Sequence, residues 1–472
     1  MAKNEWLALN RALYLPAISK AYLRVIPGGQ WKAPLPVTPA ELDFLDPKAP
    51  FHYPFALYSA GQTDPKNLNV PQPDMVMSRD RSATVVLGDS GGFQLQTGAI
   101  EFDAVNTAPR MLNWMEHVSD YSMALDLPTG GIGLPGLRNH VKRLNGYGID
   151  LSAIARANGV GESYMACLIQ LCINNNRFVR ERRPGATNFL NVLQGRNHGE
   201  SRQWYEAVKH YPFEGWAFAG AHQSTPSMIV ARMLDMHRDG ILGKVRWLHI
   251  LGTSKLEMGC VLTAIQQEVR KLGYPEFQIS FDASSPSMAA VYGTVNIGHA
   301  SSAHGWAMQT MKFSDLVQRF AGRPEPLAVL LREVMEDKSR SNIRRRIAAS
   351  THISRNLTIA DLDPSGGSLI AHDTYDLIMH HNTQALIQAH RNVQDGFWED
   401  RDGYDNNDRK PASVLVKVEG VRGLFADPNG AALARTWGKE FLDVWPAIAG
   451  MSEPDEPELS EDLEQFIAAN PI

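Results

Sequence analysis

The chain has 472 residues, of which 44% are hydrophobic and 21% are charged, a composition typical of a globular protein with a large core. Its formal net charge of −5 excludes binding to a nucleic acid through a general positive field, so any polyanion must be held by local basic clusters. Three cysteines are too few for a disulfide framework, and no run of about 18 apolar residues is present to cross a membrane. We therefore expect a cytoplasmic protein without membrane partners.

Seven short apolar runs of β type follow one another along the chain, after a proline-rich lead-in of residues 1–50. The predicted strands are residues 55–60, 83–89, 121–126, 188–195, 215–220, 246–252 and 277–282. Segments with helical patterning lie between several of them, at 201–210, 226–237 and 255–272. Near-continuous apolar runs are typical of parallel strands that are covered on both faces. The alternation predicts an α/β fold, a (βα)8 TIM barrel with insertions and a C-terminal helical extension.

The predicted barrel domain occupies residues 51–395, with an insertion at about 127–187 that contains a helix-like run at 161–182. A further helix is expected at 369–395. A C-terminal extension follows at 396–450, and the tail at 451–472 is acidic.

Two basic clusters are candidates for local contacts with a polyanion. The first runs from Arg177 to Arg183, and the second runs from Lys338 to Arg346 and includes Arg344 and Arg345. A solvated helix face is the ordinary alternative for either cluster.

The segment GDSGGF, which contains Asp89 and Ser90, has two functional interpretations. Trypsin-like proteases carry a similar sequence around their nucleophile, which would make Ser90 catalytic. Those proteases are all-β, and their His and Asp precede the serine, whereas here an apolar strand leads into the motif. The second interpretation is a strand that ends in Asp89, two glycines that let a flat ligand approach, and Phe93 as an aromatic face. A tight turn with Asp89 as a helix cap is the structural alternative.

The segment GIGLPG at residues 131–136 matches the glycine spacing of a dinucleotide fingerprint. An NAD-dependent oxidoreductase is the hypothesis that follows from it. Prolines interrupt the segment, the preceding strand ends several residues earlier, and the next acid, Asp150, comes too early. A surface loop is therefore the favoured interpretation.

Asp282 ends the apolar strand of ISFDASSP, as Asp89 ends an earlier one. In a barrel the carboxyl ends of the strands meet at one mouth, so these residues become neighbours. A pair of carboxylates is what displacement at a glycosidic carbon requires, one as nucleophile and one as proton donor and acceptor.

Asp126, Gln194 and Gly220 lie at the ends of three other predicted strands. A carboxylate accepts hydrogen bonds from N1–H and the 2-amino group of guanine, while an amide side chain and a backbone N–H donate to its O6. These residues are therefore a candidate set for purine recognition, with a structural hydrogen bond at a strand end as the alternative.

Several motifs, in one order, resemble the guanine transglycosylases, enzymes that exchange guanine in tRNA, and still more the relatives that insert 7-deazaguanines into DNA. The matching segments are GDSGGFQ (88–94), LDLP (125–128), NVLQG (191–195), FAGAH (218–222), LHILGTSK (248–255), FDASSP (281–286) and YGTVNIG (292–298). They cover roughly residues 83–300, and HHNTQALIQAH at 380–390 resembles the C-terminal helix of that family.

The resemblance implies a (βα)8 barrel in which Asp282 is the covalent nucleophile and Asp89 the general acid/base. It also implies which residues contact the base, with Phe93 as one stacking wall and His249 as the opposite wall. The implied base-contacting residues are Ser90, Gly91, Gly92, Phe93, Asp126, Gln194, Gly195, Gly220, Ala221 and His249.

The chain departs from the tRNA enzymes of this family at their structural zinc, which is held by a Cys-x-Cys-x-x-Cys run and a later histidine. No cysteine lies beyond Cys260, so that site cannot form. We therefore expect no zinc and no cofactor; the alternative is a zinc bound by His380, His381, His390 and carboxylates.

The function expected from the resemblance is exchange of guanine in DNA for a 7-deazaguanine of the preQ0 type, through a covalent Asp–sugar intermediate. The expected partners are DNA, held in part by Arg344, Arg345 and Arg346, the free base, and a second copy of the chain in a homodimer. The same exchange on tRNA is the first alternative, and a catalytically inactive nucleic-acid-binding relative is the second.

Overall fold

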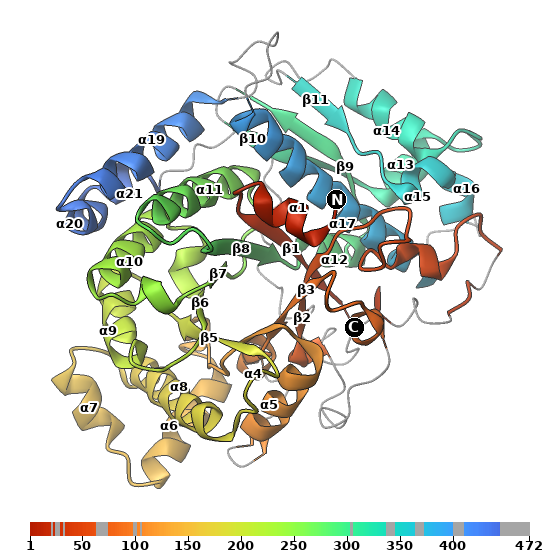
Figure 1. Ribbon diagram of the computed structural model, residues 1–472. Coiled ribbons are helices and arrows are strands. Elements are labelled where there is room, and N and C mark those ends of the chain that lie inside the picture. Colours follow the sequence, from red (N-terminus) through yellow and green to blue (C-terminus); the bar gives the residue numbers. More distant parts are fainter. Residues whose placement is uncertain are drawn as a thin grey trace.

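The computed structural model describes residues 1–19, 22–23, 29–31, 34–62, 74–97, 102–103, 106–302, 305–336, 345–363, 372–399 and 410–443. Eight parallel strands form a closed barrel in chain order, which confirms the predicted α/β barrel (Figure 1). The strands are β1 (Leu13–Ile18), β2 (Phe55–Ser59), β3 (Val85–Asp89), β4 (Tyr121–Met123), β5 (Asn188–Leu193), β6 (Gly215–Phe218), β7 (Trp247–Ile250) and β8 (Gln278–Ala283).

The first strand lies inside the segment that we predicted to be an irregular lead-in, so that prediction was wrong. β1 closes the barrel by pairing with β8, where Leu15 lies opposite Asp282 and Pro16 opposite Ala283. Proline lacks a backbone N–H and is usually confined to edge strands, which is why LYLPAI was not predicted as a barrel strand.

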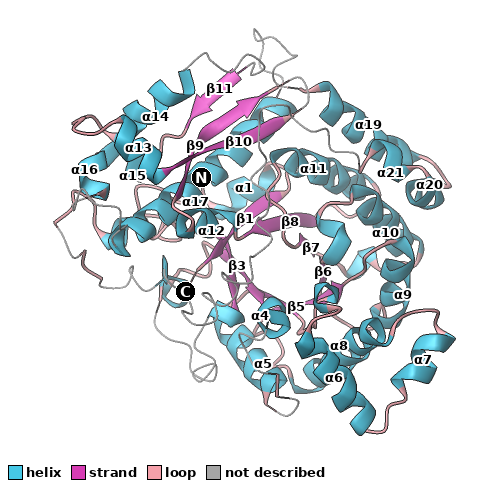
Figure 2. Cartoon of the chain, turned by 180° about the vertical axis from the view of Figure 1, so that it is seen from behind, coloured by secondary structure: helices cyan, strands magenta, loops and turns pink. Residues whose placement is uncertain are grey.

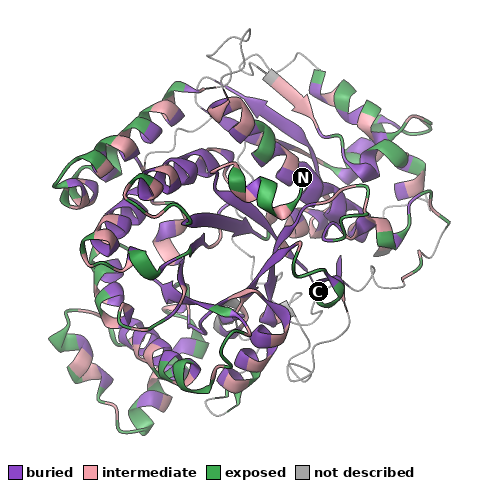
Figure 3. Cartoon of the chain, in the orientation of Figure 1, coloured by how far each residue is buried: buried purple, intermediate pink, exposed green. Residues whose placement is uncertain are grey.

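Helices surround the barrel and bury its outer face, and the seams between strands and helices form the core (Figure 3). The large helices of this ring are α5 (Thr107–Val118), α8 (Glu162–Glu181), α9 (His198–Val208), α10 (Pro226–Arg238), α11 (Leu256–Lys271) and α17 (His372–Trp398). The last of these contacts β1 and α11 and so covers the junction between the last and the first strand. It corresponds to the predicted helix at 369–395.

Shorter elements occupy the connections before, between and after the barrel strands. They are α1 (Lys3–Ala8), η1 (Pro39–Leu42), η2 (Ala60–Gln62), α3 (Met75–Ser78), α4 (Gly92–Thr97), η5 (Gly220–Gln223), η6 (Leu242–Lys244) and α12 (Ser285–Val291). The predicted insertion contains η4 (Thr129–Gly131), α6 (Pro135–Gly146) and α7 (Leu151–Ala157), followed by α8. In Figures 1 and 2, α6 and α7 project from the ring of helices.

A small antiparallel sheet, which the sequence did not lead us to expect, lies beside the barrel. Its strand order is β10 (Trp306–Lys312), β9 (Thr294–Ser301) and β11 (Arg345–Ala348). Four helices accompany it: α13 (Phe313–Arg319), α14 (Leu327–Glu336), α15 (His352–Asn356) and α16 (Ile359–Leu362). The C-terminal extension forms α19 (Ala412–Ala426), α20 (Gly430–Thr436) and α21 (Gly438–Phe441), which contact α10 and α11. Within the described ranges, none of the helices has the length and apolar character needed to span a bilayer.

Candidate active site

The carboxyl ends of the parallel strands meet at one mouth, which is the usual position of the active site in such barrels. Asp89 is the last residue of β3 and lies opposite Ser59 of β2. Asp282 lies near the end of β8, opposite Leu15 of β1. Because the barrel is closed, β8 and β3 are separated by only β1 and β2. The predicted convergence of the two carboxylates on one mouth is therefore a consequence of the strand order.

Asp89 is partly exposed at the mouth and has an environment that favours its protonated form. Enclosure by the surrounding protein raises the pKa of its carboxyl group, and the nearby charge of Asp282 raises that pKa further. Hydrogen bonds from the Ser59 side chain and the Gly91 backbone act in the opposite direction. A carboxyl group with a raised pKa suits a residue that donates and then accepts a proton near neutral pH.

Asp282 is 7% exposed and is held through one of its two oxygens. Its Oδ1 accepts a hydrogen bond from the backbone N–H of Gly252 (3.0 Å) and lies 3.1 Å from Nε2 of His249. Two donors on one oxygen fix the plane of the carboxylate. Within the described structure the second oxygen, Oδ2, accepts no hydrogen bond and is available to a ligand.

Two further residues hold His249 in place from below the mouth. Nδ1 of His249 lies 2.8 Å from Oγ of Ser280, and the indole N–H of Trp247 donates to the same oxygen at 2.7 Å. Nε2 must carry a proton to bond the Asp282 carboxylate, so in the neutral ring Nδ1 is an acceptor. We therefore assign the Ser280 hydroxyl as the donor to Nδ1, which leaves Oγ to accept from Trp247.

This arrangement differs from the role that the resemblance implied for His249. The imidazole is fully buried, with 0% exposure, because His249 pairs with Ser280 and lies one layer deeper in the barrel than Asp282. Both ring nitrogens are engaged within the protein. A ring in this position orients the Asp282 carboxylate and does not offer an open face for stacking.

Asp126 and Gln194, the predicted base readers, contact each other directly. The amide N–H of Gln194 donates to Asp126 Oδ2 at 2.7 Å, and the Thr129 hydroxyl donates to Gln194 Oε1 at 3.2 Å. Burial raises the pKa of Asp126 to about 7, the hydrogen bond from Gln194 opposes that rise, and the charge of Asp89 adds to it. Gln194 keeps a second amide hydrogen for a ligand.

Two glycines allow the backbone to approach these side chains. A Cβ on Gly92 would lie 2.7 Å from Asp126 Oδ1. Gly220 has a φ of +63°, and a Cβ there would lie 2.8 Å from the carbonyl oxygen of Gly195 and 3.1 Å from Gln194 Oε1. Substitution at either glycine would therefore displace the polar groups that face a ligand. The Ala221 N–H also donates to the Gly195 carbonyl at 3.0 Å, which ties η5 to the end of β5.

Ser90 is buried at the start of the loop after β3, and among the described residues its hydroxyl has no hydrogen-bond partner. A serine nucleophile needs an adjacent base, so this environment agrees with our rejection of the protease interpretation. The GIGLPG segment also lacks the context of a dinucleotide fingerprint, because β4 ends at Met123 and η4 intervenes. Phe93 belongs to α4, but its side chain lies outside the described structure.

Two of the three histidines of the alternative zinc site, His380 and His381, form hydrogen bonds, and the third, His390, is buried with its ring stacked on Tyr14. His380 Nδ1 lies 2.6 Å from the Tyr22 hydroxyl. His381 is bonded on both sides, from Nδ1 to Thr351 Oγ1 at 2.7 Å and from Nε2 to the Asn296 carbonyl at 2.8 Å. Across the described ranges, no group of three or more His, Cys, Asp or Glu is placed to hold a metal ion. These residues do not match the three cysteines and one histidine that hold zinc in the tRNA enzymes described above. The expectation that the chain binds no zinc stays a prediction.

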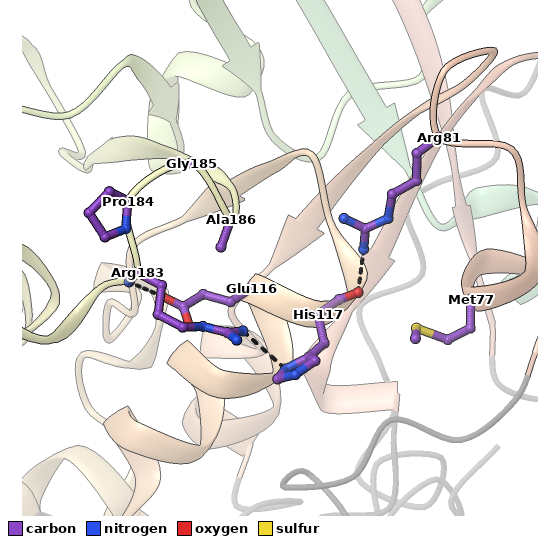
Figure 4. A pocket seen from close by; sticks show the side chains of 8 residues that line it. All are labelled: Met77, Arg81, Glu116, His117, Arg183, Pro184, Gly185 and Ala186. Carbon is purple, nitrogen blue, oxygen red and sulfur yellow. Dashed lines mark hydrogen bonds and ion pairs between the residues drawn. The ribbon is translucent and has the colours of Figure 1, made fainter.

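The first basic cluster lies at the opposite end of the barrel, where a surface hollow of about 620 Å³ opens between the residues that precede β3, β4 and β5 (Figure 4). Arg183 there pairs with the buried Glu116 at 2.6 Å. Arg177 and Arg180 pair with Glu181, and Arg182 pairs with Glu214. Because these charges are neutralised and far from the mouth, the cluster does not support our hypothesis of a polyanion contact.

The second basic cluster lies mostly outside the described residues. This holds for Arg344 and for the side chain of Arg345, while Arg346 is partly buried on β11. The structure therefore leaves their predicted contact with DNA as a prediction.

No known protein-family model matches the chain, and no curated protein matches its sequence.

Proposed function

We propose that the chain is a base-exchange transglycosylase that replaces guanine in DNA with a 7-deazaguanine of the preQ0 type. The observation that carries the proposal is the asymmetric pair of carboxylates at the barrel mouth. Asp282 has one oxygen fixed by two donors, and the raised pKa of Asp89 suits it to proton transfer. Such an asymmetry is what double displacement at a glycosidic carbon requires.

In the first half of the reaction, Asp282 Oδ2 attacks C1′ of a guanosine that has been rotated out of the duplex. The C1′–N9 bond breaks, its electron pair stays on the guanine, and the proton of Asp89 moves to the leaving base. The product is an ester between Asp282 and C1′. His249 and Gly252 stay bonded to Oδ1 during this step, so they hold the attacking oxygen in line.

In the second half, guanine leaves and the 7-deazaguanine takes its place. Asp89, now ionised, accepts the proton from N9 of the incoming base. N9 attacks C1′, the ester bond breaks, and Asp282 returns as a carboxylate. Two displacements at the same carbon retain its configuration. The exchange needs no net oxidant or reductant.

Recognition of the base follows from the polar groups at the ends of β4, β5 and β6. Asp126 accepts from N1–H and the 2-amino group, Gln194 donates its second amide hydrogen to O6, and the Gly220 backbone lies beside them. The N1–H, the 2-amino group and O6 are present in both guanine and 7-deazaguanine. The pocket therefore suits exchange of one base for the other.

The experiment measures incorporation of labelled guanine and of a labelled 7-deazaguanine into a guanine-containing DNA duplex and into tRNA. We expect incorporation into DNA with the wild type and none with Asp282→Asn. The matched control is Asp427→Asn, because Asp427 is exposed directly after α19 and accepts a turn hydrogen bond from Asn429 N–H, which an asparagine side chain also accepts. Incorporation into tRNA alone would move the assignment to the tRNA enzymes, and no incorporation into either polymer would overturn the proposal.

A further inference from the structure

The insertion between β4 and β5 carries cations that form no ion pair with a residue that the structure describes. From Leu127 to Gly161 the sequence holds four Arg and Lys and a single carboxylate, that of Asp150, which is committed to capping α7. Arg138 and Lys142 are exposed and four residues apart, so they share one face of α6. Neither forms an ion pair with a described residue, in contrast to the basic residues at the end of α8.

Further groups suited to a polyanion extend this surface, which we call the α6–α7 face. Arg156 on α7 is exposed, and within the described structure it bonds only the Ser152 carbonyl. Tyr147, directly after α6, is 65% exposed and presents an aromatic ring on the same surface. The carbonyl of Asn158 accepts from Gln203 of α9, which brings the exposed Arg202 next to the same surface.

The α6–α7 face is tied to the base-reading end of the site. The chain leaves β4 through Asp126 and Thr129, both bonded to Gln194, and enters α6 at Pro135. Even if the segment from Thr129 to Pro135 were fully extended, Arg138, in the first turn of α6, would lie within about 27 Å of Thr129. That distance corresponds to about eight base pairs of a duplex. In addition, α6 contacts α4, the helix that follows Asp89.

We propose that the α6–α7 face binds the phosphate backbone of duplex DNA beside the nucleotide that enters the barrel. The inference rests on the proposed function and adds the surface that holds the polymer. The argument is charge complementarity: a chain of net charge −5 holds a polyanion only where cations are local and unpaired. Arg138 and Lys142 neutralise phosphates, and Tyr147 supplies an aromatic plane for a displaced base.

The test compares the double variant Arg138→Gln/Lys142→Gln with Lys244→Gln/Arg332→Gln, which removes two exposed cations from η6 and α14. Both variants change the net charge equally, and glutamine keeps the helical propensity of the exposed positions. Binding of a guanine-containing duplex oligonucleotide is measured at several salt concentrations. We expect the α6 variant to lower the salt slope by about two units and to weaken binding roughly 50-fold at 0.1 M salt. The control should bind as the wild type does.

The outcomes separate this inference from the proposed function. If the α6 variant and the control bind DNA alike while labelled base still enters DNA, the surface is elsewhere and the exchange chemistry stands. If the wild type binds no duplex DNA but binds and modifies tRNA, the proposal that the α6–α7 face binds duplex DNA is wrong. If the α6 variant loses DNA binding but the wild type exchanges no base, the surface stands and the catalytic proposal falls.

Discussion

Replacing Ser280 with alanine removes a hydroxyl group that lies two contacts away from the Asp282 carboxylate. The hydroxyl bonds Nδ1 of His249 at 2.8 Å and accepts from the indole of Trp247 at 2.7 Å. Without it, the neutral imidazole is free to carry its proton on Nδ1, which leaves a lone pair on Nε2 facing the carboxylate of Asp282. We expect formation of the Asp282 ester to slow by about 10- to 100-fold, equivalent to about 1.4–2.7 kcal/mol of barrier.

The variant should also lose stability, because the buried indole N–H of Trp247 is left without an acceptor, at a cost of about 1–3 kcal/mol. A loss of stability would not by itself change the tautomer of His249. The tautomer is measured directly by ¹⁵N NMR of labelled histidine, so the two effects can be separated. We expect His249 to be protonated on Nε2 in the wild type and in Ser280→Thr, and to lose that preference in Ser280→Ala. The Km for the free base should stay unchanged.

Two results would refute this reasoning. One is a wild-type His249 that carries its proton on Nδ1 alone. The other is a Ser280→Ala enzyme that is folded, forms the ester at the wild-type rate, and differs only in stability. Either result would mean that the hydrogen bonds from Trp247 through Ser280 and His249 to Asp282 only stabilise the barrel interior.

Three further predictions follow from the site. Asp89→Asn should reduce turnover by about two or more orders of magnitude. Ester formation by the wild type should decline as the pH rises through the raised pKa of Asp89, because the protonated carboxyl group is then lost. A rate that depends on neither the pH nor the substitution would exclude proton transfer by this residue. Asp126→Asn should raise the melting temperature at pH 8 but not at pH 4. The reason is that the pKa of Asp126 is raised to about 7, so its buried side chain is charged at pH 8 and this charge destabilises the folded state. A variant with equal or lower stability at pH 8 would contradict this. Elemental analysis of the purified protein should give far less than one zinc per chain, and a stoichiometric value would assign a metal to residues that we place in hydrogen bonds.

The strand ends were predictable because each catalytic candidate closes a run of apolar residues. Asp89 and Asp282 follow VVLG and ISF, and parallel strands of a barrel place such residues at one mouth. β1 was missed because Pro16 breaks the expected pattern, although its neighbours are as apolar as those of the other strands. The antiparallel sheet was missed because β9 and β10 were not recognised as strands at all.

Strand periodicity predicts only part of the set of residues that hold Asp282. Ser280 precedes Asp282 by two residues, and Trp247 precedes His249 by two, so each pair lies on one face of its strand. What the sequence does not contain is the register between β7 and β8, which places His249 opposite Ser280. The resemblance placed His249 in a wall of the pocket, whereas this register places it one layer below the mouth.

The central claim is that Asp282 forms a covalent bond with the sugar of the substrate. The direct measurement is to incubate the protein with guanine-containing DNA in the absence of an incoming base, denature it, and identify any modified peptide by mass spectrometry. The account predicts a nucleic-acid adduct on the peptide that contains Asp282, present in the wild type and absent from Asp282→Asn. An adduct on another residue, or base exchange that proceeds with no trapped adduct and survives Asp282→Asn, would contradict it.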